Sequence, residues 1–222
     1  MGLERELERY LPIWDRLTPE DRATLGEATT RRHAEKGTLL HNGDADCVGL
    51  LLVVSGQLRA YIVSDEGKEL TLYRLFERDI CLFSAACMMS SIRFEITLEA
   101  EKESEILVMP TEVYHAIMER SVVLANYTNQ LMASRFSEVM WLMDQLLFRR
   151  FDARLAGFLL EESAIEGSDA LEITHERIAN HMGTAREVVT RMLRYFQSEG
   201  MVSLTRGGIR LTDRAKLSAL AD

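Results

Sequence analysis

Apolar residues follow two different spacings along this chain, one typical of strands in its first half and one typical of helices in its second half. From Arg31 onward, short strand-like runs are separated by turn signals such as Asn42-Gly43 and Ser55-Gly56. No helical pattern interrupts these runs, so an antiparallel β roll is predicted. We expect its strands at residues 38–41, 48–54, 57–64, 69–75, 95–100 and 104–110.

Short helices are expected on either side of the roll. Residues 4–11 have helical spacing, and Thr18 and Pro19 open a second helix as a capping threonine and a proline at the first helical position. Leu25 lies on the apolar side of this second helix. Residues 111–120 follow Pro110 and predict a third helix.

A much longer helix is predicted between residues 122 and 147, where there is no proline or glycine. Its apolar residues recur at alternating steps of four and three, which is typical of a seam that packs on another helix. The seam packs either on its own barrel or on a second copy of the chain, and the isolated polar Asn129 suits register selection in a parallel pair. The seam residues are Val122, Ala125, Asn129, Met132, Phe136, Val139, Met143 and Leu146.

The stretch 174–212 begins with two short helices joined by a tight turn. Thr174 is suited to cap the first helix and Thr184 the second. Gly183 supplies the turn, because glycine adopts backbone angles that a side chain would block. The apolar residues at helical spacing are Ile178, Ala179 and Met182 in the first helix and Val188, Met192, Leu193 and Phe196 in the second.

The opposite face of the second helix is charged and allows two interpretations. It is either the solvated side of an ordinary amphipathic helix or the reading face of a helix-turn-helix. In the second case its arginines donate to guanine and its glutamate accepts from cytosine in the major groove. Residues 203–212 favour DNA binding, because two short strands around Gly207-Gly208 predict a hairpin and hence a winged domain. The charged face holds Arg186, Glu187, Thr190, Arg191 and Arg194.

The run from Thr174 to Leu211 resembles the C-terminal domain of the Crp/Fnr family of bacterial transcription regulators. In that family the recognition helix begins Arg-Glu and places a second arginine one turn later, as Arg186, Glu187 and Arg191 do. The Glu-x-x-Thr-Arg form at 187–191 is closer to the Fnr branch than to the cAMP-receptor branch, which has glycine before the arginine. The resemblance implies a palindromic site with TGA-containing half-sites.

Contacts with DNA are expected for six residues of the predicted reading surface. Base edges are assigned to Arg186, Glu187 and Arg191, and positions near bases or phosphates to Thr190 and Arg194. Arg206 in the predicted hairpin is assigned to a phosphate. The complete set of expected DNA-binding residues is Thr184, Arg186, Glu187, Thr190, Arg191, Arg194 and Arg206.

The strand-rich half resembles the sensor domain of the same family, a jelly-roll barrel related to cyclic-nucleotide-binding domains. In members that bind cAMP, a glutamate takes the ribose hydroxyl and a later arginine takes the cyclic phosphate. Here Cys81 stands where that glutamate is expected, and Arg93 lies about one position out of register. Because a buried phosphate without an aligned charge partner is costly, cAMP is not expected as the effector. The signal is left open as a small molecule or a redox change.

The segment from Cys81 to Met89 has an unusual composition. It forms a redox-sensitive thiol pair, lines a pocket for a small apolar or haem-like ligand, or contains cysteines that are simply small buried hydrophobes. An iron–sulfur cluster of the Fnr type needs four cysteine thiolates, three of them near the N-terminus. This chain has three cysteines, the first of which is Cys47, so such a cluster is not expected. The candidate effector-pocket residues are Cys81, Cys87, Met88 and Arg93.

Charge is distributed unevenly along the chain. The formal net charge is −9, which taken alone would argue against a DNA-binding protein. Residues 1–148 hold 15 basic and 24 acidic side chains, whereas residues 149–222 hold 11 of each. The stretch 174–216 has 8 basic and 4 acidic side chains, so the predicted reading surface is locally positive.

Composition and spacing argue against several other classes of protein. Without a run of about 18 apolar residues we expect no transmembrane helix, and residues 1–14 do not read as a signal peptide. Three cysteines fit a reducing cytoplasm better than a disulfide scaffold. The five histidines show no metalloenzyme spacing, so no metal is expected, and His175 and His181 are assigned to the surface of the DNA-binding domain. No phosphate loop or nucleophile elbow points to an enzyme.

These inferences combine into one α+β chain. We expect a β jelly-roll sensor with N-terminal helices at 1–120, a dimerisation helix at 121–148 and a winged helix-turn-helix at 149–222. The predicted function is a homodimeric transcription regulator of the Crp/Fnr type that binds palindromic double-stranded DNA, with RNA polymerase as a further partner and no membrane partner. The alternative is a ligand-binding or enzymatic barrel whose helical tail mediates protein interactions.

Overall fold

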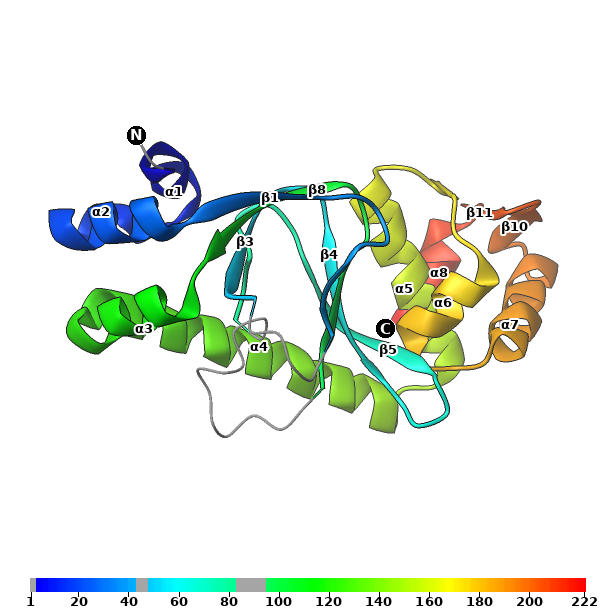
Figure 1. The fold of residues 1–222 in the computed structure, drawn as a ribbon. Helices are drawn as coiled ribbons and strands as arrows, with labels where there is room; N and C mark the ends of the chain where they lie inside the picture. The colour runs from blue at the N-terminus through cyan, green and yellow to red at the C-terminus, as the bar shows by residue number, and fades with distance from the viewer. Residues whose placement is uncertain (1–2, 43–47, 83–94) are drawn as a thin grey trace. The chain divides into compact units, whose positions relative to one another are not determined.

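The strand-like runs form two four-stranded sheets in the computed structural model, which describes residues 3–42, 48–82 and 95–222 (Figure 1). The strand orders are β1-β8-β3-β6 and β2-β7-β4-β5, with antiparallel pairing such as Leu51 opposite Val108. This is the predicted jelly roll. The strands are β1 (Thr30–Ala34), β2 (Leu39–Asn42), β3 (Leu50–Ser55), β4 (Leu58–Val63), β5 (Glu69–Leu75), β6 (Ile80–Cys81), β7 (Thr97–Ala100) and β8 (Ser104–Met109).

Two of these strands were not expected from the hydrophobic pattern. β1 has the sequence TRRHA, and four of its five side chains are exposed or half-buried, so it lacks the alternation that identifies a strand. It is held instead by its pairing with β8, from Thr30 opposite Val108 to Ala34 opposite Ser104. β6 is only two residues long and pairs with Leu51 and Leu52 of β3. Tertiary pairing, not local sequence, produces both.

β3 is buried on both faces, which explains why its sequence is a continuous apolar run. Leu51 and Val53 point into a cluster formed between the two sheets. Leu50 and Leu52 belong to a second cluster together with residues of the N-terminal helices and the long helix. Successive side chains of a strand point to opposite faces, so β3 connects the barrel interior to its helical cover.

Among the described residues, the helical elements that accompany the barrel are α1 (Glu4–Tyr10), the 3-10 turn η1 (Trp14–Arg16), α2 (Pro19–Ala28) and α3 (Thr111–Arg120). The expected cap of α2 is present, since the Asp21 backbone N–H donates to Thr18 Oγ1 at 3.2 Å. Asp21 is also the partner of Arg120 on α3, with 2.7 Å between Arg120 Nη2 and Asp21 Oδ1. This ion pair ties the start of α2 to the end of α3.

The long helix α4 (Val122–Phe148) extends one residue beyond the predicted range. Its barrel-facing side is marked by the buried Leu124, Thr128 and Arg135. Thr128 Oγ1 donates to its own helix at Leu124 O, so the Tyr114 hydroxyl of α3, 2.9 Å away, is the donor to Thr128. Burial raises the pKa of Tyr114 to about 12, so this hydroxyl keeps its proton at physiological pH.

Contacts divide the chain into two units, Met1–Ile62 with Leu72–Val139 and Val63–Thr71 with Met140–Asp222. The second unit has its own core, which includes Leu155, Leu159, Leu193 and Phe196. Its small sheet has the order β10-β11-β9. Its elements are α5 (Phe151–Glu166), β9 (Ala170–Leu171), α6 (His175–Met182), α7 (Arg186–Ser198), β10 (Val202–Thr205), β11 (Gly208–Leu211) and α8 (Arg214–Ala221).

The prediction was wrong at one cap and one apolar position of this unit. Thr184 does not cap α7: its backbone N–H bonds to Ala179 O at the end of α6, and Ala185 stands at the N-cap without a side-chain bond. On α7 Val189 is fully buried together with Leu193 and Phe196, whereas Val188 is half-buried. Val189, Leu193 and Phe196 are spaced by four and three residues, so the buried stripe of α7 runs through Val189 and Val188 lies at its margin.

Candidate DNA-binding site

Helices α6 and α7 form the predicted helix-turn-helix. Thr174 caps α6, because the Arg177 backbone N–H donates to Thr174 Oγ1 at 3.1 Å. Gly183 ends α6 with a φ of 65°, in the left-handed region that glycine adopts without a steric penalty. A Cβ at Gly183 would lie 3.1 Å from Leu70 Cδ1, so the turn is also close to a neighbouring side chain.

Helix α7 separates an apolar face from a charged one. Val189, Leu193 and Phe196 are completely buried in the core of the second unit. The charged side chains Arg186, Glu187, Arg191 and Arg194 are all exposed. This division leaves guanidinium and carboxylate groups available to base edges, which is the geometry of a recognition helix.

The two threonines of the predicted site are placed differently from the charged residues. Thr184 is half-buried in the turn between the helices. Thr190 is also half-buried, and its hydroxyl lies 2.9 Å both from Arg186 O of its own helix and from His175 Nδ1 of α6. The hydroxyl of Thr190 is therefore engaged within the domain.

The predicted wing is present as the hairpin of β10 and β11. Val202 pairs with Leu211 and Thr205 with Gly208, so the tight turn consists of Arg206 and Gly207. Gly207 has a φ of 88°, which explains the glycine there. Arg206 is exposed at the tip of this hairpin, a position from which a side chain can reach a phosphate.

The two histidines of α6 do not share the surface position that was predicted for them. His181 is buried and its ring lies 5.4 Å from that of Phe158, so the prediction was wrong for this residue. His175 is half-buried against α7. Burial lowers the pKa of His175, and the positive charges of Arg186 and Arg194 lower it further. Its contact with Thr190 was not anticipated, although both residues lie where two adjacent helices must meet.

The predicted dimer seam lies along a side of α4 that is only partly covered. Met132 packs against the barrel core, whereas Phe136 is 67% exposed and Val122 74% exposed. Asn129 is exposed as well. Further large apolar side chains are exposed on the same helix: Met140, Trp141, Met143, Leu147 and Phe148. So many exposed large apolar side chains on one helix are unusual on a protein that remains alone in water.

Of the four candidate effector-pocket residues, only Cys81 falls within the described residues, and Cys87, Met88 and Arg93 lie outside them. Cys81 is buried on β6. Tyr73 of β5 is its neighbour: the pKa of Tyr73 is raised well above its usual value, first by burial and then by the Cys81 thiol. The thiol therefore lies in the core of the barrel, beside a buried phenol.

Arg135 of α4 joins this same region to the long helix, and sequence analysis missed it. Its guanidinium lies 4.7 Å from the centre of the Tyr73 ring, 3.4 Å from Asp79 Oδ1 and 2.8 Å from Glu138 Oε2. Burial would lower the pKa of Arg135, but the hydrogen bond and charge of Glu138 and the charge of Asp79 raise it. The signal in the sequence is its spacing, since Leu124, Thr128 and Arg135 lie on one stripe of α4 beside the seam.

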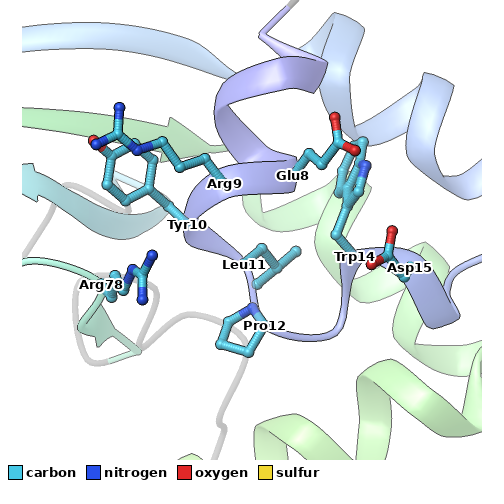
Figure 2. A pocket seen from close by; sticks show the side chains of 8 residues that line it. All are labelled: Glu8, Arg9, Tyr10, Leu11, Pro12, Trp14, Asp15 and Arg78. Atoms are coloured by element: carbon cyan, nitrogen blue, oxygen red, sulfur yellow. The ribbon is translucent and has the colours of Figure 1, made fainter.

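A small hollow of about 150 Å³ lies in the first unit, between the N-terminal segment and the turn before β6. Figure 2 shows Arg78 and Asp15 on opposite sides of Pro12. Cys81 is not among its described lining residues. The lining residues are Glu8, Arg9, Tyr10, Leu11, Pro12, Trp14, Asp15 and Arg78.

Among residues 3–42, 48–82 and 95–222, no group of three or more His, Cys, Asp or Glu side chains is arranged to hold a metal ion. Within those same ranges, no helix has both the length and the apolar character that crossing a bilayer requires.

Comparison with known proteins assigns a family to each half. Residues 31–121 match the cyclic nucleotide-binding domain, and residues 153–220 match the Crp-like helix-turn-helix domain. The "Cyclic AMP receptor protein" of Thermus thermophilus is 28% identical over 211 residues, covering 95% of this chain and 96% of that protein. The "Transcriptional activator protein anr" of Pseudomonas aeruginosa is 27% identical, covering 92% of this chain and 86% of that protein.

A crystal structure described as a transcriptional regulator of the Crp/Fnr family from Eubacterium rectale is much more similar. It is 54% identical, covers 96% of this chain and 99% of its own, and superposes with a TM-score of 0.94. These relatives are regulators and not enzymes, so the alternative of an enzymatic barrel is not retained. With a β jelly roll, a long helix and a C-terminal helix-turn-helix in this order, the chain belongs to the Crp/Fnr family of DNA-binding transcription regulators.

Proposed function

We propose that this protein acts as a homodimer and reads a palindromic DNA site with two copies of α7. The observation that carries the proposal is the division of α7 into a buried apolar face and an exposed face with three arginines and a glutamate. In a symmetric dimer two such helices enter successive major grooves about 34 Å apart. A palindromic site mirrors that two-fold symmetry.

The proposed base contacts are those of Arg186, Glu187 and Arg191. An arginine donates two hydrogen bonds to guanine, and a glutamate accepts from the amino group of cytosine. Arg194 and Arg206 are proposed to contact phosphates, which set the register of the protein on the duplex. TGA-containing half-sites remain the proposed target because of the Glu-x-x-Thr-Arg pattern at 187–191.

The proposed dimer forms along α4. Its support is the exposed apolar surface around Phe136 and Met143, because burying such side chains is favourable by about 25 cal/mol per Å². Asn129 lies within the seam as a lone polar residue, and such a residue specifies register in parallel pairs. A closed two-fold contact of this kind also gives the symmetry that a palindromic site requires.

The proposed signal is a small molecule or a redox change other than cAMP. Cys81 stands where the resemblance places a ribose-binding glutamate, and a thiol is a weak acceptor compared with a carboxylate. The buried Arg135 connects this part of the barrel to α4 through Asp79. A signal that favours one dimer geometry would therefore act through α4. RNA polymerase is proposed separately, as the protein partner of the DNA-bound dimer.

Selection of bound duplexes from a random-sequence library tests the proposal. The full chain should enrich one palindrome whose half-sites are one helical turn apart, and adding cAMP should leave both the sequence and the amount bound unchanged. A non-palindromic consensus, or no enrichment, would contradict the dimeric reading mode. A requirement for cAMP would contradict the proposed class of signal but not the DNA-binding role.

A further inference from the structure

A side-chain contact joins the two helices of the helix-turn-helix. His175 Nδ1 of α6 lies 2.9 Å from Thr190 Oγ1 of α7, and Thr190 Oγ1 donates to Arg186 O at 2.9 Å. A hydroxyl has one hydrogen, so Thr190 accepts from His175 Nδ1–H in this arrangement. A protonated imidazole donates from both nitrogens and can make the same contact. His175 can therefore gain a proton without a change in how it is held.

Thr190 lies at the centre of a basic stripe on α7. Arg186, Thr190 and Arg194 are spaced four residues apart, so their side chains share one face of the helix. His175 contacts the middle of this stripe and is flanked by the two arginines, both of which lower its pKa. On its own helix, Glu176 follows His175 and lies 4.0 Å from Arg186. A proton on His175 would thus be a third positive charge in this cluster.

We propose that His175 takes up a proton when this basic stripe contacts DNA, so that binding to DNA is proton-linked. The inference rests on the proposed function, because it needs the Arg186–Arg194 face to approach phosphates. Duplex DNA carries one negative charge per about 1.7 Å of its axis and offsets the repulsion between His175 and the arginines. His175 is then a positioning residue, since it holds Thr190 and adds charge to a surface that the arginines dominate.

The direction of the effect follows from linkage. The free protein disfavours the charged imidazole and the complex favours it, so the complex binds more protons over a range of pH around the ordinary histidine pKa of about 6.5. Affinity for DNA should therefore rise as the pH falls through this range. A pKa that rises by about one unit on binding corresponds to an increase of about tenfold in affinity for each half-site.

Fluorescence anisotropy with the full chain tests this inference. Two duplexes of equal length are used, the palindrome selected from the random library and a scrambled sequence, each from about pH 6 to about pH 8 at constant low salt. Wild-type protein is compared with His175→Gln, which keeps a hydrogen-bonding side chain without a titratable charge. His115→Gln on α3, a half-buried histidine of the first unit, is the matched control.

Wild type and His115→Gln should bind both duplexes about fivefold or more tightly at the low end of the range, whereas His175→Gln should show a flat profile. His175→Arg, which is permanently charged, should bind at high pH about as tightly as wild type does at low pH. Equal pH profiles for wild type and His175→Gln would overturn the inference alone. Equal affinity for the palindrome and the scrambled duplex at every pH would overturn the proposed function instead.

Discussion

At the scale of single residues, the sequence of α7 indicates most directly which side chains recognise DNA. Val189, Leu193 and Phe196 anchor the helix, and the exposed side chains of the opposite face are Arg186, Glu187, Arg191 and Arg194. Arg191 lies one turn beyond Glu187, so the two side chains can address neighbouring base pairs. An arginine in this position contributes specificity, whereas one that only meets phosphate contributes affinity for any sequence.

Replacing Arg191 by alanine tests that distinction. We expect the Arg191→Ala variant to lose about 1–3 kcal/mol on the selected palindrome and to relax the choice of base at one pair per half-site. Binding to a scrambled duplex should change far less. Competition binding measures both numbers, with Arg16→Ala, an exposed arginine of the first unit, as the control. An equal loss on both duplexes would assign Arg191 to phosphate.

Backbone conformation marks a second residue, Arg78, in the turn before β6. Its φ is 75°, a region that glycine adopts freely and other residues rarely do. The turn holds this conformation by bonds from the Arg78 N–H to Val53 O at 2.9 Å and from the Phe76 N–H to Asp79 Oδ2 at 2.8 Å. The strain is thus balanced by local hydrogen bonds beside the contact between Asp79 and Arg135.

The stability of variants at Arg78 should therefore follow how readily the new residue adopts a positive φ. We expect Arg78→Gly to be within about 1 kcal/mol of wild type in free energy of unfolding, and Arg78→Val to be less stable than Arg78→Gly by about 1–2 kcal/mol. Urea denaturation followed through the first unit measures the difference. Equal stability of the glycine and valine variants would show that the left-handed turn is not maintained in solution.

At the scale of elements, one side of α4 packs on the barrel and another side exposes apolar residues. Leu124 and Thr128 fasten it to the barrel, whereas Phe136 and its neighbours present apolar surface. The heptad-like spacing predicted a packing seam, and the exposed side chains support a partner outside the single chain. Arg135 adds a charged link between this helix and the turn of the barrel at Asp79.

A charge placed in the seam should separate the proposed dimer. We expect Phe136→Glu to weaken self-association by roughly two orders of magnitude or more, because a buried carboxylate without a partner is costly. Ser134→Glu adds the same charge at an exposed position of α4 outside the seam and should have little effect. Sedimentation velocity over a concentration series distinguishes the two. A wild-type chain that is monomeric throughout would contradict the proposed interface.

Two glycines form a matched pair, Gly183 in the turn between α6 and α7 and Gly200 in the turn between α7 and β10. Gly183 has a φ of 65° and Gly200 a φ of 73°, but only at Gly183 does a Cβ meet a neighbour, Leu70, within 4 Å. Both alanine variants should lose about 1 kcal/mol from the left-handed backbone, and Gly183→Ala should lose more. Thermal unfolding measures the difference. A larger loss for Gly200→Ala would contradict the account of this turn.

The sequence predicted elements with strong local signals and missed those made by tertiary contact. The range of β5, the cap at Thr18 and the turn at Gly183 follow from local physics and are found where expected. The polar strand β1 and the two-residue β6 have no such signal, because pairing with β8 and β3 creates them. The contacts of His175 and Arg135 were missed for the same reason.

At the scale of the whole molecule, residues 1–148 carry the excess of negative charge and residues 149–222 are neutral overall. The net charge of −9 belongs to residues 1–148, while residues 174–216 are basic. Total charge therefore says little about DNA binding here, and the local surface decides it. The acidic part also limits non-specific attraction to DNA, so the account predicts binding that depends on sequence.

The ratio of affinities for the selected palindrome and a scrambled duplex, at two salt concentrations, tests the central claim most directly. We expect two chains per duplex, a preference for the palindrome of about a thousandfold or more, and affinity that falls steeply as salt is raised. Equal affinity for the two duplexes, or one chain per duplex at saturation, would contradict a dimer that reads DNA through paired copies of α7.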